Sequence, residues 1–286
     1  MHFPRISVVT PSFNSATTIR ETIESVCRQK YPNVEHLVVD GGSKDGTLEI
    51  VREYPHLLWT SEKDEGHYDA MNKGIQRSAG EVIGILNSDD CYHDGALLKI
   101  AESFQKHPDW DGLFGDVVYV DQNGKTIFGR KEACYDYDVL RFGSVCYIVH
   151  PTLFLKRAVY DRLGAYRHRD YLNCCDADLI LRLGQNRCRI GHVPEFLVNY
   201  RFHEHGQSAD IRVRRNTVAE YRRIRREHGC PSGLLGMMAG GYARVRRQFQ
   251  KLVHRGSCDL IPGRWMLEKH MREKTTFSSN IGVDRL

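Results

Sequence analysis

Acidic and hydroxyl side chains gather at three turns near the start of the chain. These turns are residues 10–14 (T-P-S-F-N), 40–46 (D-G-G-S-K-D-G) and 87–90 (N-S-D-D). Carboxylates can accept hydrogen bonds from a base or a ribose, and hard oxygen ligands suit Mg²⁺ or Mn²⁺ bridging a diphosphate. Asp89 and Asp90 are adjacent like charges, and a bound cation would give a reason to keep both. If the three turns lie together, they predict a site for a ribonucleotide and a divalent metal.

Each of these turns follows a segment with the character of a buried strand. Residues 6–10, 35–40 and 81–86 are short apolar or β-branched runs, and residues 57–60 predict one further strand. Apolar residues recur at helical spacing in the segments between them. Strands that alternate with helices indicate a mostly parallel sheet covered on both faces, and ligands bind at the carboxyl ends of its strands. The three turns should therefore meet at one edge of the sheet.

The second half of the chain predicts a smaller, β-rich unit. The dipeptide Asn123-Gly124 indicates a hairpin turn, and a helix is expected after Asp176. Residues 189–193 and 196–200 predict two short strands. The fold class is therefore α/β, with a sheet that changes character after its parallel half.

The composition fits a globular protein without a disulfide framework. The chain has 286 residues, of which 41% are hydrophobic. Its nine cysteines are irregularly spaced and form no C-x-x-C pair, which argues against both disulfides and a zinc site. No stretch approaches the roughly 18 consecutive apolar residues of a membrane span, and the first residues lack a charged-then-apolar leader. We expect a cytoplasmic protein, peripheral on the inner face of the cell membrane.

Four short strings follow one another in fixed order. They are S-V-V-T-P-S-F-N (7–14), V-D-G-G-S-K-D-G-T (39–47), Y-D-A-M-N-K-G (68–74) and L-N-S-D-D (86–90). In order and spacing they resemble family 2 of the inverting glycosyltransferases, over roughly residues 5–205. The resemblance implies a GT-A fold, a Rossmann-like mostly parallel sheet with a smaller β-rich acceptor half. It also implies metal-dependent transfer of one sugar from a nucleotide-sugar, with a UDP-sugar as the expected donor.

Carried over residue by residue, the resemblance assigns a set of nucleotide-binding side chains. These are Thr10, Pro11, Ser12, Asn14, Asp40, Asp45, Lys63, Ser88 and Asp89. Asp40 would contact the base, whereas Asp45 and Lys63 would lie near the nucleotide or the sugar. The residues alone leave plainer alternatives open, because Asp and Gly dominate turns and Asp45 could simply begin a helix.

The same resemblance assigns a metal site for Mn²⁺ or Mg²⁺. Asn87-Ser88-Asp89 stands where the family has Asp-x-Asp, with Asn in the first position. Asp89 is then the expected ligand, and Asp90 would support it. A histidine near residue 203 completes the site in some relatives, so His203 is a third candidate, although it and His205 could be ordinary loop residues.

Attack by a sugar hydroxyl needs a general base near the anomeric carbon, and a carboxylate is the usual choice. Asp176 aligns with the family's base at the start of a helix, although it could instead cap that helix. Asp178 is expected to pair with Arg182 four residues on. His150 would contact the substrate on the acceptor side, with a structural histidine as the alternative.

We predict a catalytic domain over residues 1–208 and a basic helical extension over residues 209–286. The extension carries 17 Lys+Arg against 7 Asp+Glu, and we expect it to break at Gly240-Gly241 among other places. A basic helix with apolar residues can lie on an anionic leaflet, so attachment through the arginine-rich segments 212–226 and 244–255 is expected. Packing on the catalytic domain is the alternative, and no motif supports binding to nucleic acid.

Two other functions share parts of this pattern. A sugar-1-phosphate nucleotidyltransferase would need a glycine-rich phosphate loop with a basic residue after the first strand, which residues 10–14 do not provide. A non-catalytic sugar-nucleotide-binding protein would be expected to lose its acidic positions, yet Asp40, Asp89, Asp90 and Asp176 are all present. Addition of a single sugar to a glycan or a lipid-linked saccharide is therefore the favoured function.

Overall fold

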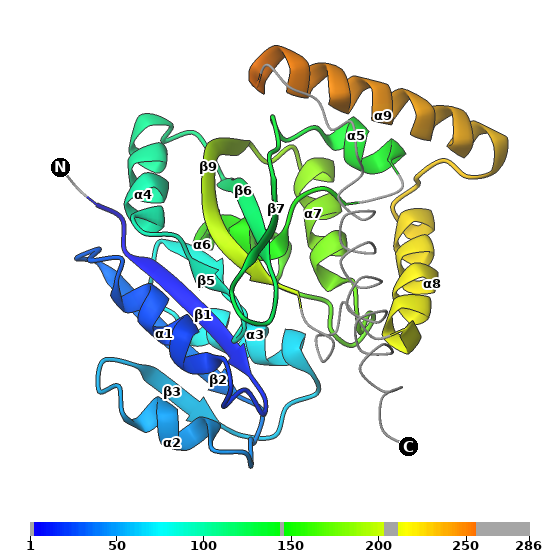
Figure 1. The fold of residues 1–286 in the computed structure, drawn as a ribbon. Helices are drawn as coiled ribbons and strands as arrows, with labels where there is room; N and C mark the ends of the chain where they lie inside the picture. The colour runs from blue at the N-terminus through cyan, green and yellow to red at the C-terminus, as the bar shows by residue number, and fades with distance from the viewer. Residues whose placement is uncertain (1–2, 144–145, 203–210, 256–286) are drawn as a thin grey trace, which may run out of the picture.

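The computed structural model describes residues 3–143, 146–202 and 211–255, and one sheet runs through most of this part of the chain (Figure 1). Its strands are β1 (Ile6–Ser12), β2 (Val34–Asp40), β3 (Leu58–Ser61), β4 (Val82–Ile85), β5 (Cys91–Tyr92), β6 (Gly112–Val120), β7 (Thr126–Arg130), β8 (Phe154–Lys156) and β9 (Ile190–Arg201). Their order is β3-β2-β1-β4-β8-β6-β9-β5, with β7 paired to β6 beside this path.

The sheet divides into a parallel half and a mixed half. Strands β3, β2, β1 and β4 are parallel to their neighbours, whereas β8 is antiparallel to both β4 and β6. On the far side, β9 runs parallel to β6, and β5 and β7 are antiparallel additions. This arrangement confirms the predicted α/β class with a β-rich second half, and it places the ends of β1, β2 and β4 at one edge.

Helices cover both faces of the sheet. They are α1 (Ile19–Cys27), α2 (Thr47–Arg52), α3 (His67–Arg77), α4 (Ala96–Lys106), α5 (Tyr137–Phe142), the 3₁₀ turn η1 (His150–Thr152), α6 (Arg157–Leu163), α7 (Cys175–Gln185), α8 (Ile211–Glu227) and α9 (Gly233–Arg255). One face packs on α1, α2 and α4, and the other packs on α3, α5, α6 and α7.

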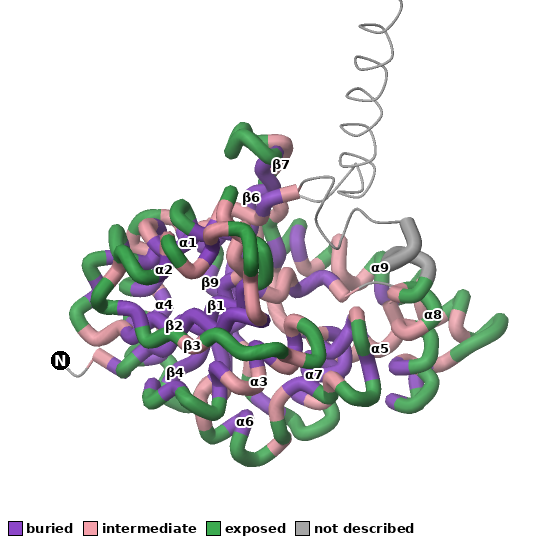
Figure 2. Tube along the Cα trace, turned by 90° about the horizontal axis from the view of Figure 1, so that it is seen from below, coloured by how far each residue is buried: buried purple, intermediate pink, exposed green. Residues whose placement is uncertain are grey.

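The alternation of side chains along β1 explains why both faces are apolar. Val8 packs in the cluster with α1 and α4, and the next residue, Val9, packs in the cluster with α3 and α7. Gly74 allows α3 to lie close to β1, because a Cβ there would stand 2.2 Å from Val9 Cγ1. Figure 2 shows the central strands as the buried interior and the two last helices as mostly exposed or intermediate.

The structure corrects three local predictions. Residues 189–193 and 196–200 belong to one strand, β9, whose pairing with β6 is irregular near Gly115 and Asp116. Helix α9 continues through Gly240-Gly241, where a break was expected. Gly240 lies on the inner side of the helix, where a Cβ would stand 3.5 Å from the Phe142 carbonyl oxygen.

The third correction concerns the start of α1. The spacing of Thr18 and Glu21 in the sequence predicts a capping box, but Thr18 makes no side-chain cap to its own helix. Its hydroxyl instead donates to the carbonyl oxygen of Ser88, 2.8 Å away on the turn after β4. Thr18 therefore ties the start of α1 to the turn after β4.

The basic extension packs on the sheet domain through α8 and α9. Ile224 of α8 is fully buried in the core that contains α7, and His228 follows it into the interior. The boundary predicted near residue 208 lies outside the described residues. None of the helices in the described ranges is both long enough and apolar enough to cross a membrane.

Candidate active site

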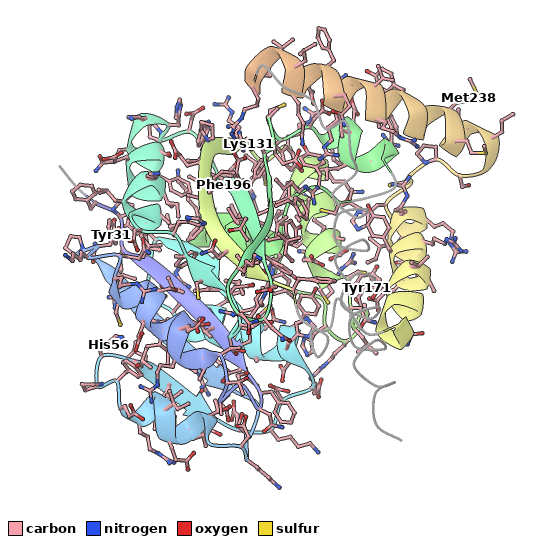
Figure 3. All side chains as sticks on the ribbon, viewed as in Figure 1. Tyr31, His56, Lys131, Tyr171, Phe196 and Met238 are labelled. Atoms are coloured by element: carbon pink, nitrogen blue, oxygen red, sulfur yellow. The ribbon has the colours of Figure 1, made fainter. Side chains whose placement is uncertain are left out.

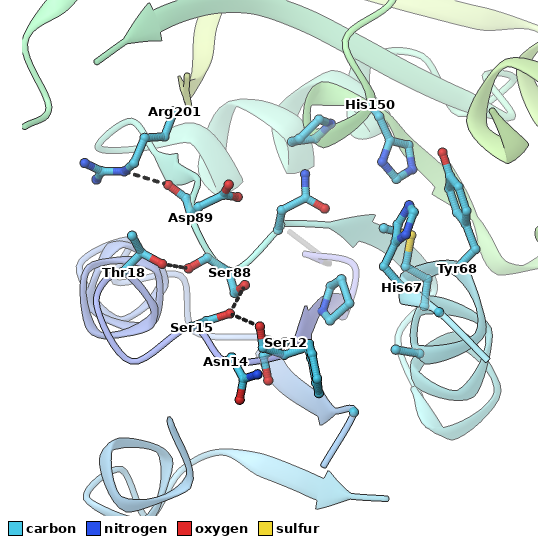
Figure 4. A pocket seen from close by; sticks show the side chains of 18 of the residues that line it. Ser12, Asn14, Ser15, Thr18, His67, Tyr68, Ser88, Asp89, His150 and Arg201 are labelled. Atoms are coloured by element: carbon cyan, nitrogen blue, oxygen red, sulfur yellow. Dashed lines mark hydrogen bonds between the residues drawn. The ribbon is translucent and has the colours of Figure 1, made fainter. Parts of the chain in front are cut away.

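A pocket of about 1390 Å³ opens at the carboxyl ends of β1 and β4 and is closed on the far side by α3, η1 and α7 (Figure 4). Eight of the predicted side chains line it: Pro11, Ser12, Asn14, Lys63, Ser88, Asp89, His150 and Asp176. Four other predicted residues, Thr10, Asp40, Asp45 and Asp90, do not line it. His203 lies outside the described residues.

Hydrogen bonds join the first turn to the other two. Asn14 has a left-handed backbone (φ 49°), a conformation that Asn tolerates better than most residues. Its N–H donates to Ser43 Oγ at 2.7 Å, and its Oδ1 accepts from the Lys44 N–H at 3.0 Å. Ser15 Oγ lies 2.8 Å from Ser88 Oγ. The pocket floor is therefore one connected unit built from three separate stretches of sequence.

Arg201, at the end of β9, holds the turn after β4 from the other side. Its Nε donates to the backbone oxygen of Asp89 at 3.0 Å, and its NH1 donates to the Gln122 carbonyl at 2.8 Å. Its NH2 pairs with Glu21. With Thr18 on one side and Arg201 on the other, the backbone of the turn that carries Asp89 is held at the pocket (Figure 4). Arg201 was not among the site residues predicted from the sequence.

Asp90 faces the interior instead of the pocket. It is 1% exposed, and its carboxylate accepts the Arg201 N–H at 2.9 Å and Asn87 Nδ2 at 3.0 Å. Burial, and secondly the charge of Asp89, raise the pKa of Asp90 well above its ordinary value. Its position removes Asp90 from the candidate metal ligands, because adjacent residues on a tight turn point in different directions.

Asp40 is occupied by its own turn. Its carboxylate is 1% exposed and accepts hydrogen bonds from five donors. These are Ser12 Oγ, the Gly42 and Ser43 N–H groups, Ser43 Oγ and Ser61 Oγ. Burial alone would raise the pKa of Asp40, but the donors led by Ser43 and Ser61 outweigh it, and the pKa is lowered. Asp40 therefore shapes the second turn and does not reach the pocket.

Thr10 and Asp45 also serve the scaffold. Thr10 is fully buried, with Oγ1 2.9 Å from His36 Nε2. Asp45 accepts from Thr47 Oγ1 at 2.6 Å and from the Thr47 N–H at 3.1 Å in the first turn of α2, and from the Ala16 N–H at 3.0 Å. The structure thus has Asp45 at the start of a helix, the plainer of the two sequence interpretations.

Asp176 lies in the first turn of α7 and lines the pocket opposite the turn after β4. The hydroxyl of Tyr68, in the first turn of α3, donates to Asp176 Oδ1 at 2.9 Å. Burial first, and then the charge of Asp176, raise the pKa of Tyr68 well above its ordinary value, so the phenol remains a donor. Tyr68 begins one of the four strings that carry the family resemblance, but no role was predicted for it, and no feature of its spacing signalled this contact.

Two histidines share this side of the pocket with Asp176 (Figure 4). Burial lowers the pKa of His67 to about 4, and it also lowers the pKa of His150. Both imidazoles are therefore neutral near pH 7. His150 Nε2 lies 2.6 Å from the Tyr166 hydroxyl, so His150 is at once a pocket residue and a structural one. His67 was not singled out by the sequence.

Asp178 is buried on the opposite side of α7. Its carboxylate is fully buried and pairs with Arg182 at 2.9 Å, as predicted, but also with Arg167 and with His228 at 2.8 Å. Burial opposes ionisation, yet these partners hold the pKa of Asp178 well below its ordinary range. Asp178 therefore connects α7 to the end of α8, and Asp176 is the only one of the two carboxylates at the pocket.

The side chains at the pocket can be compared with the ligands that a divalent cation prefers. In the part of the chain that the structure describes, no group of three or more His, Cys, Asp or Glu side chains could hold a metal ion. Mg²⁺ is commonly bound by one or two carboxylates together with substrate phosphates and water, not by an all-protein cage. The carboxylate of Asp89, on a turn held at the pocket, fits this mode.

A family model described as Glycosyl transferase family 2 matches residues 7–164, more than half of the chain. The chain belongs to this family. This glycosyltransferase is 30% identical over 193 residues to a PGL/p-HBAD biosynthesis glycosyltransferase of Mycobacterium tuberculosis, covering 65% of the chain and 72% of the relative. It is 28% identical over 233 residues to the glycosyltransferase YwdF of Bacillus subtilis, covering 79% and 84%.

Solved structures of similar fold include two with bound donors. One is residues 1–349 of S. aureus TarS in complex with UDP-GlcNAc, with a TM-score of 0.62 and 20% identity over 87% of this chain and 73% of that one. The other is a mannosyltransferase of Pyrobaculum calidifontis in complex with GDP-Man and Mn²⁺, with a TM-score of 0.62 and 18% identity over 87% and 72%. In a longer TarS structure the match covers 37% of that chain. These likenesses confirm the predicted GT-A fold of this glycosyltransferase.

Proposed function

We propose that this glycosyltransferase is a metal-dependent inverting enzyme that moves one sugar from a nucleotide-sugar to a saccharide or lipid-linked saccharide. The observation that carries the proposal is the position of two carboxylates at one pocket. Asp89 lies on the turn after β4, and Asp176 lies at the start of α7, bonded to Tyr68 on the opposite side (Figure 4). Asp89 can hold a cation at the leaving diphosphate, and Asp176 can take the proton of the acceptor hydroxyl.

The donor is expected at the edge formed by the three turns. The pocket is bordered there by Pro11, Ser12 and Asn14. Lys63 also lines it, and its ammonium group can pair with a diphosphate. TarS binds UDP-GlcNAc and the Pyrobaculum enzyme binds GDP-Man, which supports a nucleotide-sugar as donor. We keep a UDP-sugar as the expected class. Thr10, Asp40 and Asp45 act indirectly, by shaping the turns.

Asp89 would hold Mn²⁺ or Mg²⁺ together with the diphosphate of the donor. A bound cation would neutralise the charge that develops on the leaving diphosphate. Arg201 and Thr18 contribute by fixing the turn that carries Asp89. His203 remains a predicted further ligand.

Asp176 is the proposed general base. As the acceptor hydroxyl attacks the anomeric carbon, its proton passes to Asp176, the new carbon–oxygen bond forms, and the bond from the anomeric carbon to the diphosphate breaks. Attack from the side opposite the leaving group inverts the anomeric configuration. Tyr68 orients the carboxylate, and the neutral His67 and His150 can accept or donate hydrogen bonds to sugar hydroxyls without adding charge.

A panel of UDP-, GDP- and dTDP-sugars tests this function. Release of nucleoside diphosphate is measured with Mn²⁺, with Mg²⁺ and with excess EDTA, in the presence of saccharide and lipid-linked acceptors. We expect turnover with one class of donor, loss of turnover in EDTA and a product of inverted configuration. Tight binding of a donor without any turnover would favour a non-catalytic sugar-nucleotide-binding protein.

A further inference from the structure

Helix α9 carries its apolar side chains on the outside. Nine large apolar side chains of this helix are each at least 52% exposed: Leu234, Leu235, Met237, Met238, Tyr242, Val245, Phe249, Leu252 and Val253. At ~100° per residue they fall on one side of the helix, which we call the outer stripe. Figure 3 shows Met238 pointing away from the domain near the end of α9 that is joined to α8. A surface helix normally turns such a stripe toward the core, so α9 is inverted.

Small residues and ion pairs fill the inner side of α9. Ala243 is 1% exposed against the domain. Arg246 pairs with Asp136 at 2.6 Å, and Lys251 pairs with Glu132 at 3.3 Å. Both carboxylates are buried.

Two further arginines of α9 face the same way. Arg247 also pairs with Glu132, at 2.5 Å, and Arg255 pairs with the buried Asp116 at 2.5 Å. Four of the five Lys and Arg side chains of α9 are therefore directed at the protein. The expectation that the arginines of residues 244–255 contact anionic lipid does not fit this geometry, because these cations hold the helix in place.

We propose that the outer stripe of α9 inserts into the interfacial region of a lipid bilayer, with the helix axis in the plane of the membrane. The ion pairs beneath fix the helix as a platform, and apolar burial supplies the attachment. The length and polarity of α9 suit this orientation, since it is not apolar enough to span.

The charges around the outer stripe favour lipid over a second copy of the chain. Helix α9 contains no Asp or Glu. Arg244 is exposed, as are Arg222 and Arg226 on the preceding helix α8. Two such surfaces placed face to face would bring like charges together, whereas phospholipid headgroups offer phosphates to them. This proposal does not rest on the catalytic assignment and can fail or hold independently of it.

Flotation of the full chain with vesicles tests the proposal. The vesicles are phosphatidylcholine alone or with phosphatidylglycerol, in low salt and in 1 M salt. We expect binding to both compositions and a bound fraction that survives 1 M salt, since salt screens charge attraction but not apolar insertion. The double variant Val245→Glu/Phe249→Glu should lower the partition coefficient at least ~10-fold, because charged groups are costly in the bilayer. Leu98→Glu, an exposed apolar-to-acid change on α4, is the matched control and should bind like the wild type.

Four outcomes would overturn the proposal. In the first, the full chain binds neither kind of vesicle. In the second, it binds only anionic vesicles and only in low salt, which would show that the arginines make the attachment. Sedimentation could show a dimer that the double variant dissociates, which would make a second copy the occupant. A chain ending after Arg255 could bind while the full chain does not, which would make residues 256–286 the cover. Equal melting temperatures of the double variant and the wild type establish that the variant is folded.

Discussion

Tyr68 donates a hydrogen bond to Asp176 across 2.9 Å, although 108 residues separate them in the sequence. Each lies in the first turn of its helix, α3 for the tyrosine and α7 for the aspartate. The contact connects the parallel, donor-side half of the sheet domain to the half expected to bind the acceptor. Asp176 is therefore oriented by the same helix that packs on β1 and β2.

Removal of this hydrogen bond should slow the reaction without weakening donor binding. For Tyr68→Phe we expect kcat to fall by about 10-fold and the donor KM to stay unchanged, as for an interaction that serves the reacting group. The same substitution in an Asp176→Asn background should add little, because residues that act as a unit are not additive. Additive losses in this double-mutant cycle would contradict the orienting role of Tyr68.

The two adjacent carboxylates after β4 should behave differently. Asp89→Ala should abolish metal-dependent turnover and leave the melting temperature unchanged, since its side chain is at the pocket. Asp90→Ala should instead lower the free energy of unfolding by about 1–3 kcal/mol, because it leaves the buried Arg201 N–H without an acceptor. Thermal unfolding and Mn²⁺ titrations of nucleoside diphosphate release measure both. Loss of stability in Asp89→Ala alone would reverse the assignment.

Arg201 should matter through the turn that it holds. Arg201→Gln removes the contacts to Asp89, Gln122 and Glu21, and we expect kcat/KM for the donor to fall at least ~10-fold as the turn loses its fixed geometry. The control is Arg189→Gln, because the exposed ion pair of Arg189 with Asp109 contributes little to stability and lies outside the site. Equal kinetics of the two variants would exclude a role for Arg201 at the site.

Acid should destabilise the protein through a buried histidine. Burial lowers the pKa of His36 to about 3 in the folded protein, whereas the unfolded chain takes up that proton near pH 6.5. The unfolded state therefore binds more protons below that pH, and the free energy of unfolding should fall as the pH drops from about 6.5 toward 3. Urea unfolding over this range should show a shallower fall for His36→Gln. Identical pH dependence of the two proteins would remove His36 as the cause.

The sequence predicted the edge of the sheet better than it predicted individual contacts. The sequence could predict that the three turns meet, because strands separated by helices run parallel in one sheet and their carboxyl ends then share one edge. Strands β1, β2 and β4 follow this rule. Which of Asp89 and Asp90 faces the pocket depended on Arg201, whose partners Glu21, Asp89 and Gln122 are distant in sequence. No local pattern carries that information.

The same limit applies to the last helix. The sequence predicted a basic helix with apolar residues, but the orientation of α9 depends on Asp116 in β6 and on Glu132 and Asp136 after β7. An amphipathic pattern alone favours the apolar side as the inner one. Only the tertiary ion pairs reverse it.

Turnover of Asp176→Asn tests the central claim most directly. The variant keeps the size of the side chain but cannot accept the proton of the acceptor hydroxyl, so we predict that kcat falls by ~10²-fold or more. Calorimetry should show unchanged binding of the nucleoside diphosphate, and Asp178→Asn should lose stability more than turnover, because Asp178 pairs with Arg167 and Arg182 in the interior. Full turnover in Asp176→Asn, or a greater loss of turnover in a folded Asp178→Asn, would contradict the assignment of Asp176 as the base.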